Sequence, residues 1–301
     1  MKLRGAYRIV LRLLPSLKHF VELVYSHGIE IQRLESKMNM LKAEVNSLRV
    51  EKATSYTAAF SPHSRHISKN DLKVIASKWL PRFGYENNGH ELKMLGYIAH
   101  RICSLEYICI GRTAGTITTH LLRVLAARSL EGNTLDVLEV GTLFGIGAIE
   151  IYDNSLGSFD NIHLTVIDPL DNFYGEALDC YTRIPVTREI LEANMKRCAI
   201  PESDYTIIQK LSHDEDAIRE ASQRRYDILV IDGDHTYEGV KKDYTNYRPL
   251  VKAGGYIVFD DYWANFTGIV KFVDEEVRGT PNVVLVGADA DDRIAIFRAV
   301  K

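Results

Sequence analysis

An apolar run that leads into three closely spaced glycines, VLEVGTLFGIG at Val137–Gly147, sets the architecture that we expect of this chain. Its first residues have the apolar character of a buried strand, and Gly141, Gly145 and Gly147 follow where the chain must turn sharply into a helix. Glycine permits such a turn and lets a ligand approach the backbone closely. Because tight strand–helix packing also uses glycine, the loop alone is weak evidence for a ligand.

A carboxylate after the next strand strengthens the case for a cofactor. Asp168 closes the run HLTVID, 21 residues beyond Gly147. An acidic residue at this place accepts hydrogen bonds from the ribose hydroxyls of a nucleotide-type cofactor. Loop and carboxylate together predict a cofactor that contains adenosine. The loop lacks the Gly-x-Gly-x-x-Gly spacing that accommodates a pyrophosphate, which disfavours a nucleotide-dependent oxidoreductase.

The rest of the chain, from about residue 68 onward, alternates strands and helices. We expect helices near 70–80, 90–106 and 115–129, and then strands at 136–140, 163–167, 205–208, 226–231 and 255–259, separated by helices that include 187–198, 214–223 and 238–250. A helix near 266–277 precedes two last strands, 283–286 and 294–298, joined by the turn GADADD. The alternation predicts an α/β fold with a doubly wound, mostly parallel seven-stranded sheet, and the last pair predicts a C-terminal antiparallel hairpin.

The N-terminal segment has a different pattern. Apolar residues recur at heptad spacing in Ile31, Leu34, Met38, Leu41, Val45 and Leu48. This spacing favours a two-stranded coiled coil, but the flanking charges leave strand number and direction open, and a single amphipathic helix packed on its own catalytic domain is the alternative. We expect a helical coiled-coil arm at 1–52, which makes a homo-oligomer through residues 16–52, a linker at 53–67 and a catalytic domain at 68–301.

Composition and charge indicate where the protein is located in the cell and which kinds of partner it binds. The net charge of −3 gives no indication of a nucleic-acid partner. The charge is unevenly distributed: residues 1–60 have a net charge of +5 and the remaining residues one of −8. The basic N-terminus is therefore the part that we expect to touch a membrane surface or a partner. No apolar run approaches the ~20 residues of a membrane span, and Cys103, Cys109, Cys180 and Cys198 show no metal-ligand spacing. These features predict a cytoplasmic protein with reduced thiols, in part peripheral to a membrane.

Acidic residues follow two neighbouring strands. The run YDILVIDGDHTYEG starts at Tyr226 and reaches Asp232 and His235, and KAGGYIVFDDYW ends in Asp260-Asp261 before Tyr262 and Trp263. Parallel strands bring their carboxyl ends to one edge of the sheet. Clustered carboxylates need a cation or a proton, and oxygen ligands favour Mg²⁺, Mn²⁺ or Ca²⁺ over zinc. The alternative is that these acids cap the following helices.

These motifs resemble known methyltransferases. Glu139 with Gly141 and Gly145 resembles the first motif of class I S-adenosylmethionine methyltransferases, which have a Rossmann-like fold. Residues 110–300 resemble the metal-dependent O-methyltransferases related to catechol O-methyltransferase, and in particular the branch of macrolide-sugar and bacterial glycan enzymes. In that branch Asp-Gly-x-His carries the catalytic histidine, here Asp232-Gly-Asp-His235. Catechol-type enzymes have a lysine at this position and an Asp-Asn pair in place of Asp260-Asp261.

The resemblance implies a site and a reaction. S-adenosylmethionine would lie on Glu139, Gly141, Gly145, Gly147, Asp168, Ser212 and Asp232, and the metal on Asp232, Asp260 and Asp261. His235 would accept the proton of the acceptor hydroxyl; its alternative role is a hydrogen bond that orients Asp232. Asp171–Pro185 is either a lid over the acceptor or an ordinary surface loop, and Tyr262, Trp263 and Phe266 either line the acceptor site or pack internally.

We therefore expect metal-dependent O-methylation of a sugar hydroxyl on a glycan or glycosylated metabolite. A small aromatic diol is the alternative acceptor, and His235 in place of lysine favours the sugar. A catalytically silent scaffold that uses its coiled coil to organise a partner is the alternative from another class. The intact set of Asp232, His235, Asp260 and Asp261 speaks against it, because a silent domain does not need clustered acids.

Overall fold

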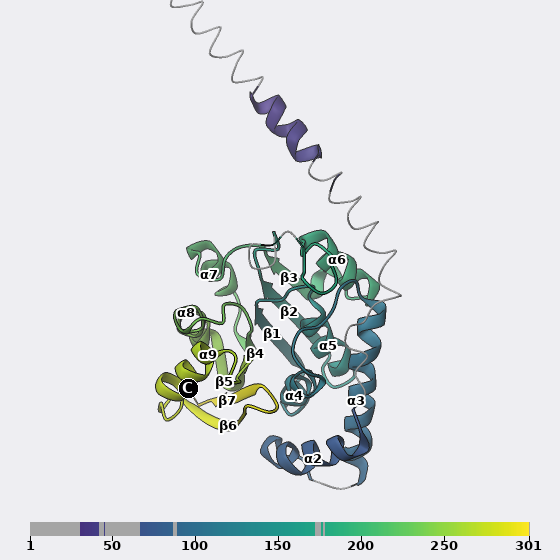
Figure 1. Ribbon diagram of the computed structural model, residues 1–301, viewed down its shortest axis with the longest axis vertical. Helices are drawn as coiled ribbons and strands as arrows, with labels where there is room; N and C mark the ends of the chain where they lie inside the picture. Colours follow the sequence, from purple (N-terminus) through teal and green to yellow (C-terminus); the bar gives the residue numbers. More distant parts are fainter. Residues whose placement is uncertain are drawn as a thin grey trace, which may run out of the picture. The chain divides into compact units, whose positions relative to one another are not determined.

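The computed structural model describes residues 31–41, 45, 67–86, 89–171, 176 and 178–300. The chain divides into two compact units, Met1–Glu51 and Lys52–Lys301. In the first unit, residues 31–41 are helical (Figure 1). The side chains of Ile31, Leu34, Met38 and Leu41 are exposed. The remaining positions of the predicted coiled coil, Val45 excepted, lie outside the described residues. So does the linker predicted at 53–67, except for Ile67.

The described part of the second unit contains a seven-stranded mixed sheet, which confirms the predicted fold class (Figure 1). Its spatial order is β3-β2-β1-β4-β5-β7-β6. The first five strands pair in parallel, and β7 pairs antiparallel with both β5 and β6, as predicted for the terminal hairpin. Their bounds are β1 Thr134–Val140, β2 Asn161–Ile167, β3 Tyr205–Ile208, β4 Tyr226–Ile231, β5 Val251–Asp260, β6 Val283–Asp289 and β7 Ile294–Ala299.

Helices cover both faces of this sheet (Figure 1). Three of them, α3 (Gly89–Ile108), α4 (Ile117–Arg128) and α5 (Ile146–Ser155), pack against one another on one face, and α2 (Lys69–Trp79) packs on α3. On the other face lie α7 (Glu215–Ala221), α8 (Tyr237–Tyr247) and α9 (Thr267–Phe272). The helix α6 (Arg188–Arg197) connects β2 to β3. No helix among the described residues is long and apolar enough to cross a membrane.

Two helices change to another helical form before their predicted ends. The helix expected at 238–250 ends at Tyr247 and continues as a 3₁₀ turn, Arg248–Leu250. Pro249 explains this end, because proline has no N–H to continue the α-helical ladder. The helix expected at 266–277 is α-helical only to Phe272, and a π-helical turn, Val273–Val277, completes it.

The carboxyl ends of β1 and β4 approach closely enough to require glycine. Gly141 follows β1 with φ of +80°, and a Cβ on it would lie 2.3 Å from the carbonyl oxygen of Asp232. The amide of Asp232 in turn donates to the carbonyl of Val140 at 2.8 Å. Only a residue without a side chain fits both the backbone conformation and the space. The glycine-rich loop and the first predicted acid therefore share one edge of the sheet.

Candidate active site

The predicted acids meet at the carboxyl edge of two neighbouring strands. Asp232 follows β4 directly, and Asp260 is the last residue of β5. The next residue, Asp261, has the left-handed φ of +52°, and its amide donates to Oδ1 of Asp260 at 2.9 Å. This turn points the two adjacent carboxylates in different directions: Asp260 is 1% exposed, whereas the side chain of Asp261 is 14% exposed. The two residues, near-equivalent in the sequence, are therefore not equivalent in the fold.

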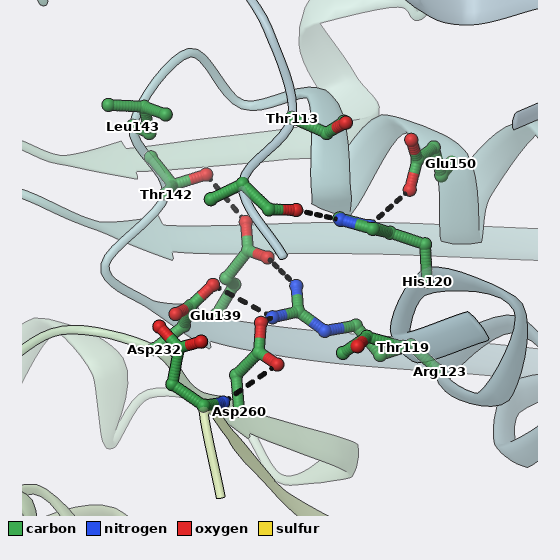
Figure 2. Close-up of polar contacts among 12 residues, drawn as sticks. Thr113, Thr119, His120, Arg123, Glu139, Thr142, Leu143, Glu150, Asp232 and Asp260 are labelled. Carbon is green, nitrogen blue, oxygen red and sulfur yellow. Dashed lines mark hydrogen bonds and ion pairs between the residues drawn. The ribbon is translucent and has the colours of Figure 1, made fainter. Parts of the chain in front are cut away.

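A buried arginine on α4 lies at the centre of the acids (Figure 2). Nη1 of Arg123 donates to Oε1 of Glu139 at 3.1 Å, and Nη2 donates to Oδ2 of Asp232 at 2.7 Å. Nη2 also donates to Oδ2 of Asp260. The side chain of Arg123 is 1% exposed, so its charge is balanced by these three carboxylates rather than by water.

Sequence reasoning missed Arg123. A signal was present, because His120 and Arg123 stand three residues apart among the apolar residues of a helix that precedes the first strand. His120 is buried as well: its Nδ1 lies 2.6 Å from Oε2 of Glu150, and its Nε2 lies 2.5 Å from the carbonyl of Ala114 (Figure 2). The imidazole is therefore held in place between the carboxylate of Glu150 and the backbone of Ala114.

Burial and the arginine shift the pKa values of the acids in opposite directions. Burial raises the pKa of Asp260 to about 7 and that of Glu139 to about 7, although Arg123 opposes both shifts. Burial also acts upward on Asp232, but Arg123 and His235 outweigh it and lower its pKa to about 2. Asp232 is thus the firmly ionised acid of the cluster, and Asp260 and Glu139 are the acids that hold a proton most readily.

A second group of ligand atoms faces outward from the same edge. One ligand atom each of Asp232, His235 and Asp261 lies within 4.8 Å of the other two. Nε2 of His235 is 3.5 Å from Oδ2 of Asp261 and 3.8 Å from Oδ1 of Asp232. Ligands of an octahedral Mg²⁺ at 2.0–2.1 Å stand roughly 3–4 Å apart, so this spacing fits one cation. Asp260 is not in the group, because its carboxylate is turned toward Arg123.

His235 is held between acids and an aromatic ring. Burial acts to lower the pKa of His235, but Asp232, Asp261 and Asp260 together raise it above the ordinary value. Its ring centroid is 4.3 Å from that of Phe266. Phe266 thus packs against His235, the predicted base. Tyr262 is 8% exposed, and its hydroxyl donates to Asp274 at 3.0 Å, so this residue serves internal packing.

Asp168 organises the glycine-rich loop. Its Oδ2 accepts from the amides of Thr142 at 2.9 Å and Leu143 at 3.2 Å, and its Oδ1 accepts from the amide of Leu170 at 2.9 Å. Burial is the largest cause of its raised pKa, and the three amides act against it. Each carboxylate oxygen has about two acceptor sites, so these three bonds leave one site on Oδ1 for a ribose hydroxyl.

The other residues predicted to bind the cofactor differ in their burial and in their contacts. Gly145 is the N-cap residue of α5 and lies in the loop that Asp168 holds. A Cβ on Gly147 would lie 2.8 Å from Oε1 of Glu139 and 3.0 Å from Nη1 of Arg123, so this glycine makes room for the buried ion pair. Glu139 itself is 1% exposed and accepts from the Thr142 hydroxyl at 2.5 Å. The backbone carbonyl of Ser212 accepts a hydrogen bond from the hydroxyl of Tyr247.

The segment Asp171–Pro185, in its described part, is anchored beside the site. Arg112 donates through Nη2 to Oδ1 of Asp179 at 2.7 Å, and both side chains are buried. The Arg112 guanidinium also lies 4.6 Å from the ring centroid of Tyr181, whose side chain is exposed. Residues 172–175 and 177 lie outside the described residues, so whether the segment is a lid stays a prediction.

Comparison with known proteins identifies the family. A model described as a methyltransferase domain matches residues 109–262, just over half of the chain. The matched part begins directly after α3 and runs through the glycine-rich loop and β4 to just beyond the acidic pair Asp260-Asp261. The chain therefore belongs to this methyltransferase family. The expectation of a methyltransferase is confirmed.

Individual relatives are more distant. An uncharacterized protein of Acanthamoeba polyphaga mimivirus is 34% identical over 145 residues, which are 48% of this chain and 58% of the relative. The O-methyltransferase TomG from Streptomyces achromogenes, solved with SAM, is 15% identical and covers 69% of this chain and 89% of its own, with a TM-score of 0.43. The MycE methyltransferase of the mycinamycin biosynthetic pathway, solved with Mg and SAH, is 17% identical and covers 69% and 55%, with a TM-score of 0.42. At this level of similarity neither structure carries a conclusion about acceptor or metal.

Proposed function

We propose that this member of the methyltransferase family transfers a methyl group from S-adenosylmethionine to a sugar hydroxyl, with a divalent cation held by Asp232 and Asp261. The observation that carries the proposal is the meeting of Asp232, His235 and Asp261 within 4.8 Å at the edge that also bears the glycine-rich loop. Cofactor loop and acid group share this edge because Gly141 brings the backbone of β1 against that of Asp232. Donor and acceptor would therefore meet there.

The cofactor part of the proposal rests on Asp168 and the loop that it holds. The amides of Thr142 and Leu143 point at the carboxylate and fix the loop in a defined shape. A loop that is already ordered loses little conformational freedom when a ligand binds. Three amides use three of the roughly four acceptor sites of the Asp168 carboxylate, and the site that remains on Oδ1 can accept from a ribose hydroxyl.

The metal part of the proposal uses two of the three acids predicted from the sequence, Asp232 and Asp261. Asp261 is partly exposed and lies beside His235, whereas Asp260 is buried and bonded to Arg123. We therefore assign the direct ligands to Asp232 and Asp261 and give Asp260 the task of holding Arg123. A divalent cation bound there would orient the acceptor hydroxyl and lower its pKa.

His235 is placed to take the proton that the acceptor loses. Its side chain is 18% exposed and faces both proposed ligands, so an oxygen seated between them would lie within its reach. Its raised pKa comes from those carboxylates. Once their charge is neutralised, His235 releases its own proton more readily and becomes a base suited to neutral pH. A histidine at this place, rather than lysine, is what favours a sugar over an aromatic diol.

The test is methyl transfer from labelled S-adenosylmethionine to glycans of the source organism, with a catechol-type diol as the competing acceptor. We expect labelled glycan, loss of labelling with a chelator and recovery with Mg²⁺. His235→Gln should abolish labelling and keep S-adenosylmethionine affinity in calorimetry. Labelling of the diol alone would reject the sugar, chelator-resistant labelling would reject the metal, and the absence of cofactor binding would reject the whole assignment.

A further inference from the structure

We propose that Cys109 and Cys198 form a redox-sensitive pair that hydrogen peroxide converts into a disulfide. Their sulfur atoms lie 3.5 Å apart, although the residues are 89 positions apart in the sequence. Cys109 follows the end of α3 and is buried, and Cys198 caps the end of α6 and is partly exposed. The pair takes no part in the proposed methyl transfer, and the inference does not depend on that function.

The backbone around the two cysteines is held in place from both sides. The side chain of Asn194, on α6, accepts from the amide of Ile110 at 2.6 Å and donates to the carbonyl of the same residue at 2.9 Å. Nη1 of Arg197 donates to the carbonyl of Ile108 at 2.9 Å. These bonds bracket Cys109 and tie its segment to the last turns of α6. The approach of the two sulfurs is thus imposed by the fold and is not a chance contact between mobile side chains.

A disulfide requires only a small further movement. The S–S bond is about 2.05 Å long, so the sulfurs have to close by roughly 1.5 Å. Rotation of a cysteine side chain about its Cα–Cβ bond moves the sulfur by a distance of this order. The two sulfur atoms are therefore already close to bonding distance.

The two thiols are suited to different steps of the reaction. The hydrogen bond with Cys109 is the largest cause of a lowered pKa at Cys198, and the positive charges of Arg101 and Arg197 act in the same direction. Burial and the carboxylate of Asp153, which pairs with Arg101, oppose the shift. Cys198 is thus the partly exposed thiol that forms a thiolate more easily, and thiolates are the species that peroxide oxidises.

The chemistry balances with peroxide as the named oxidant. The Cys198 thiolate attacks one oxygen of hydrogen peroxide and breaks the O–O bond; the hydroxide that leaves takes up a proton as water, and Cys198 becomes a sulfenic acid. The sulfur of Cys109 then attacks the sulfur of Cys198, and the hydroxyl leaves with the Cys109 proton as a second water. Two thiols lose two electrons in all, and one peroxide gains them.

The pair lies next to the cofactor loop, so oxidation of the two cysteines would act on that loop. Nδ2 of Asn194 also donates to the carbonyl of Phe144 in the glycine-rich loop at 2.9 Å. The ring of Phe144 packs so closely on Gly111 that a Cβ there would lie 2.4 Å from it. One asparagine therefore links the cysteine junction to the loop, two residues from the Asp168-bound amide of Thr142.

The experiment is peptide mapping of the full chain after treatment with hydrogen peroxide and alkylation of the remaining thiols. We expect a Cys109–Cys198 linked peptide in wild type and in Cys180→Ser, and its disappearance in Cys198→Ser and after dithiothreitol. Cys180 is the matched control, because its side chain is more exposed than that of Cys198 and would oxidise first if access alone decided. Oxidised wild type should also unfold at a higher temperature than the reduced protein, a difference that Cys198→Ser removes.

Two results would overturn the inference. One is oxidation of Cys180 while Cys109 and Cys198 remain alkylated as free thiols. The other is oxidation of Cys198 to sulfinic acid without any linked peptide. Both are read from wild type and Cys180→Ser, so they do not depend on whether a variant at the buried Cys109 folds.

Discussion

Nη2 of Arg123 donates to Oδ2 of Asp232 at 2.7 Å, from a guanidinium that is almost fully buried. The same nitrogen bonds Asp260, so one arginine from α4 joins the ends of β4 and β5. A cation built into the protein thereby neutralises part of the acid cluster. The outward side of the cluster, Asp261 with the outer carboxylate oxygen of Asp232, is left for a ligand.

Arg123→Met should destabilise the protein by about 3–5 kcal/mol, because it leaves buried carboxylates without their counter-charge. Urea unfolding measures the difference. Arg188→Met is the control: Arg188 forms an exposed ion pair with Glu192, and its loss should cost less than about 1 kcal/mol. Similar losses in the two variants would contradict a structural role for Arg123.

The metal ligands can be separated by three isosteric variants. Asp232→Asn and Asp261→Asn should each weaken Mn²⁺ binding by at least about tenfold, since each removes a charged oxygen ligand. Asp260→Asn should change it much less, because that carboxylate faces Arg123. Titration calorimetry of the full chain gives the three affinities. If Asp260→Asn has the largest effect, the ligand set that we propose is wrong.

Asp168→Ala should weaken S-adenosylmethionine binding by at least about tenfold, because hydrogen bonds to a charged group are worth roughly 1.5–3 kcal/mol each. Asp160→Ala serves as the comparison, since Asp160 is exposed and precedes the same strand. Calorimetry reports both affinities. Equal binding by the two variants would remove Asp168 from the cofactor site.

The buried pair of Arg112 and Asp179 predicts a pH effect. Burial acts to raise the pKa of Asp179, but Arg112 and Thr182 outweigh it, and the pKa lies below 3.8. A carboxyl whose folded pKa is depressed stabilises the protein above its unfolded pKa, and this stability is lost as the pH falls through the folded value. Asp179→Asn should therefore be less stable than wild type by on the order of 3 kcal/mol at pH 7.

The gap between Asp179→Asn and wild type should be constant above about pH 5 and narrow below about pH 4. Urea unfolding at a series of pH values measures it. A gap that stays constant down to the lowest pH would show that the carboxylate charge is not what stabilises this pair.

The N-terminal helix provides the test of the proposed oligomer. Leu34 and Met38 lie on the heptad seam, whereas Met40 is off the seam and is 71% exposed. Leu34→Asp with Met38→Asp should lower the mass of the full chain in light scattering, because charge at seam positions opposes a coiled coil. Met40→Asp should leave it unchanged. If the seam variant keeps the wild-type mass, the helix is not the oligomer contact.

The sequence by itself was enough to predict the sheet and the edge of the sheet at which the candidate site lies. Short apolar runs typical of buried strands alternate with helical segments, and the glycines after Val140 and the acids after Ile231 and Phe259 mark where the strands end. These are local signals, because each depends on residues that are neighbours in the chain. For the same reason the sequence alone assigns Asp232 to the carboxyl edge of the sheet.

The different roles of the acidic residues could be assigned only from the tertiary structure. Asp260 and Asp261 are adjacent and chemically alike, and only the left-handed turn at Asp261 and the buried guanidinium of Arg123 separate an inner carboxylate from an outer one. Arg123 and Asp232 are 109 positions apart in the sequence, and Cys109 and Cys198 are 89 positions apart, yet the members of each pair are in contact. Such contacts arise from the packing of helices against the sheet and from the burial of charge, which no local pattern encodes.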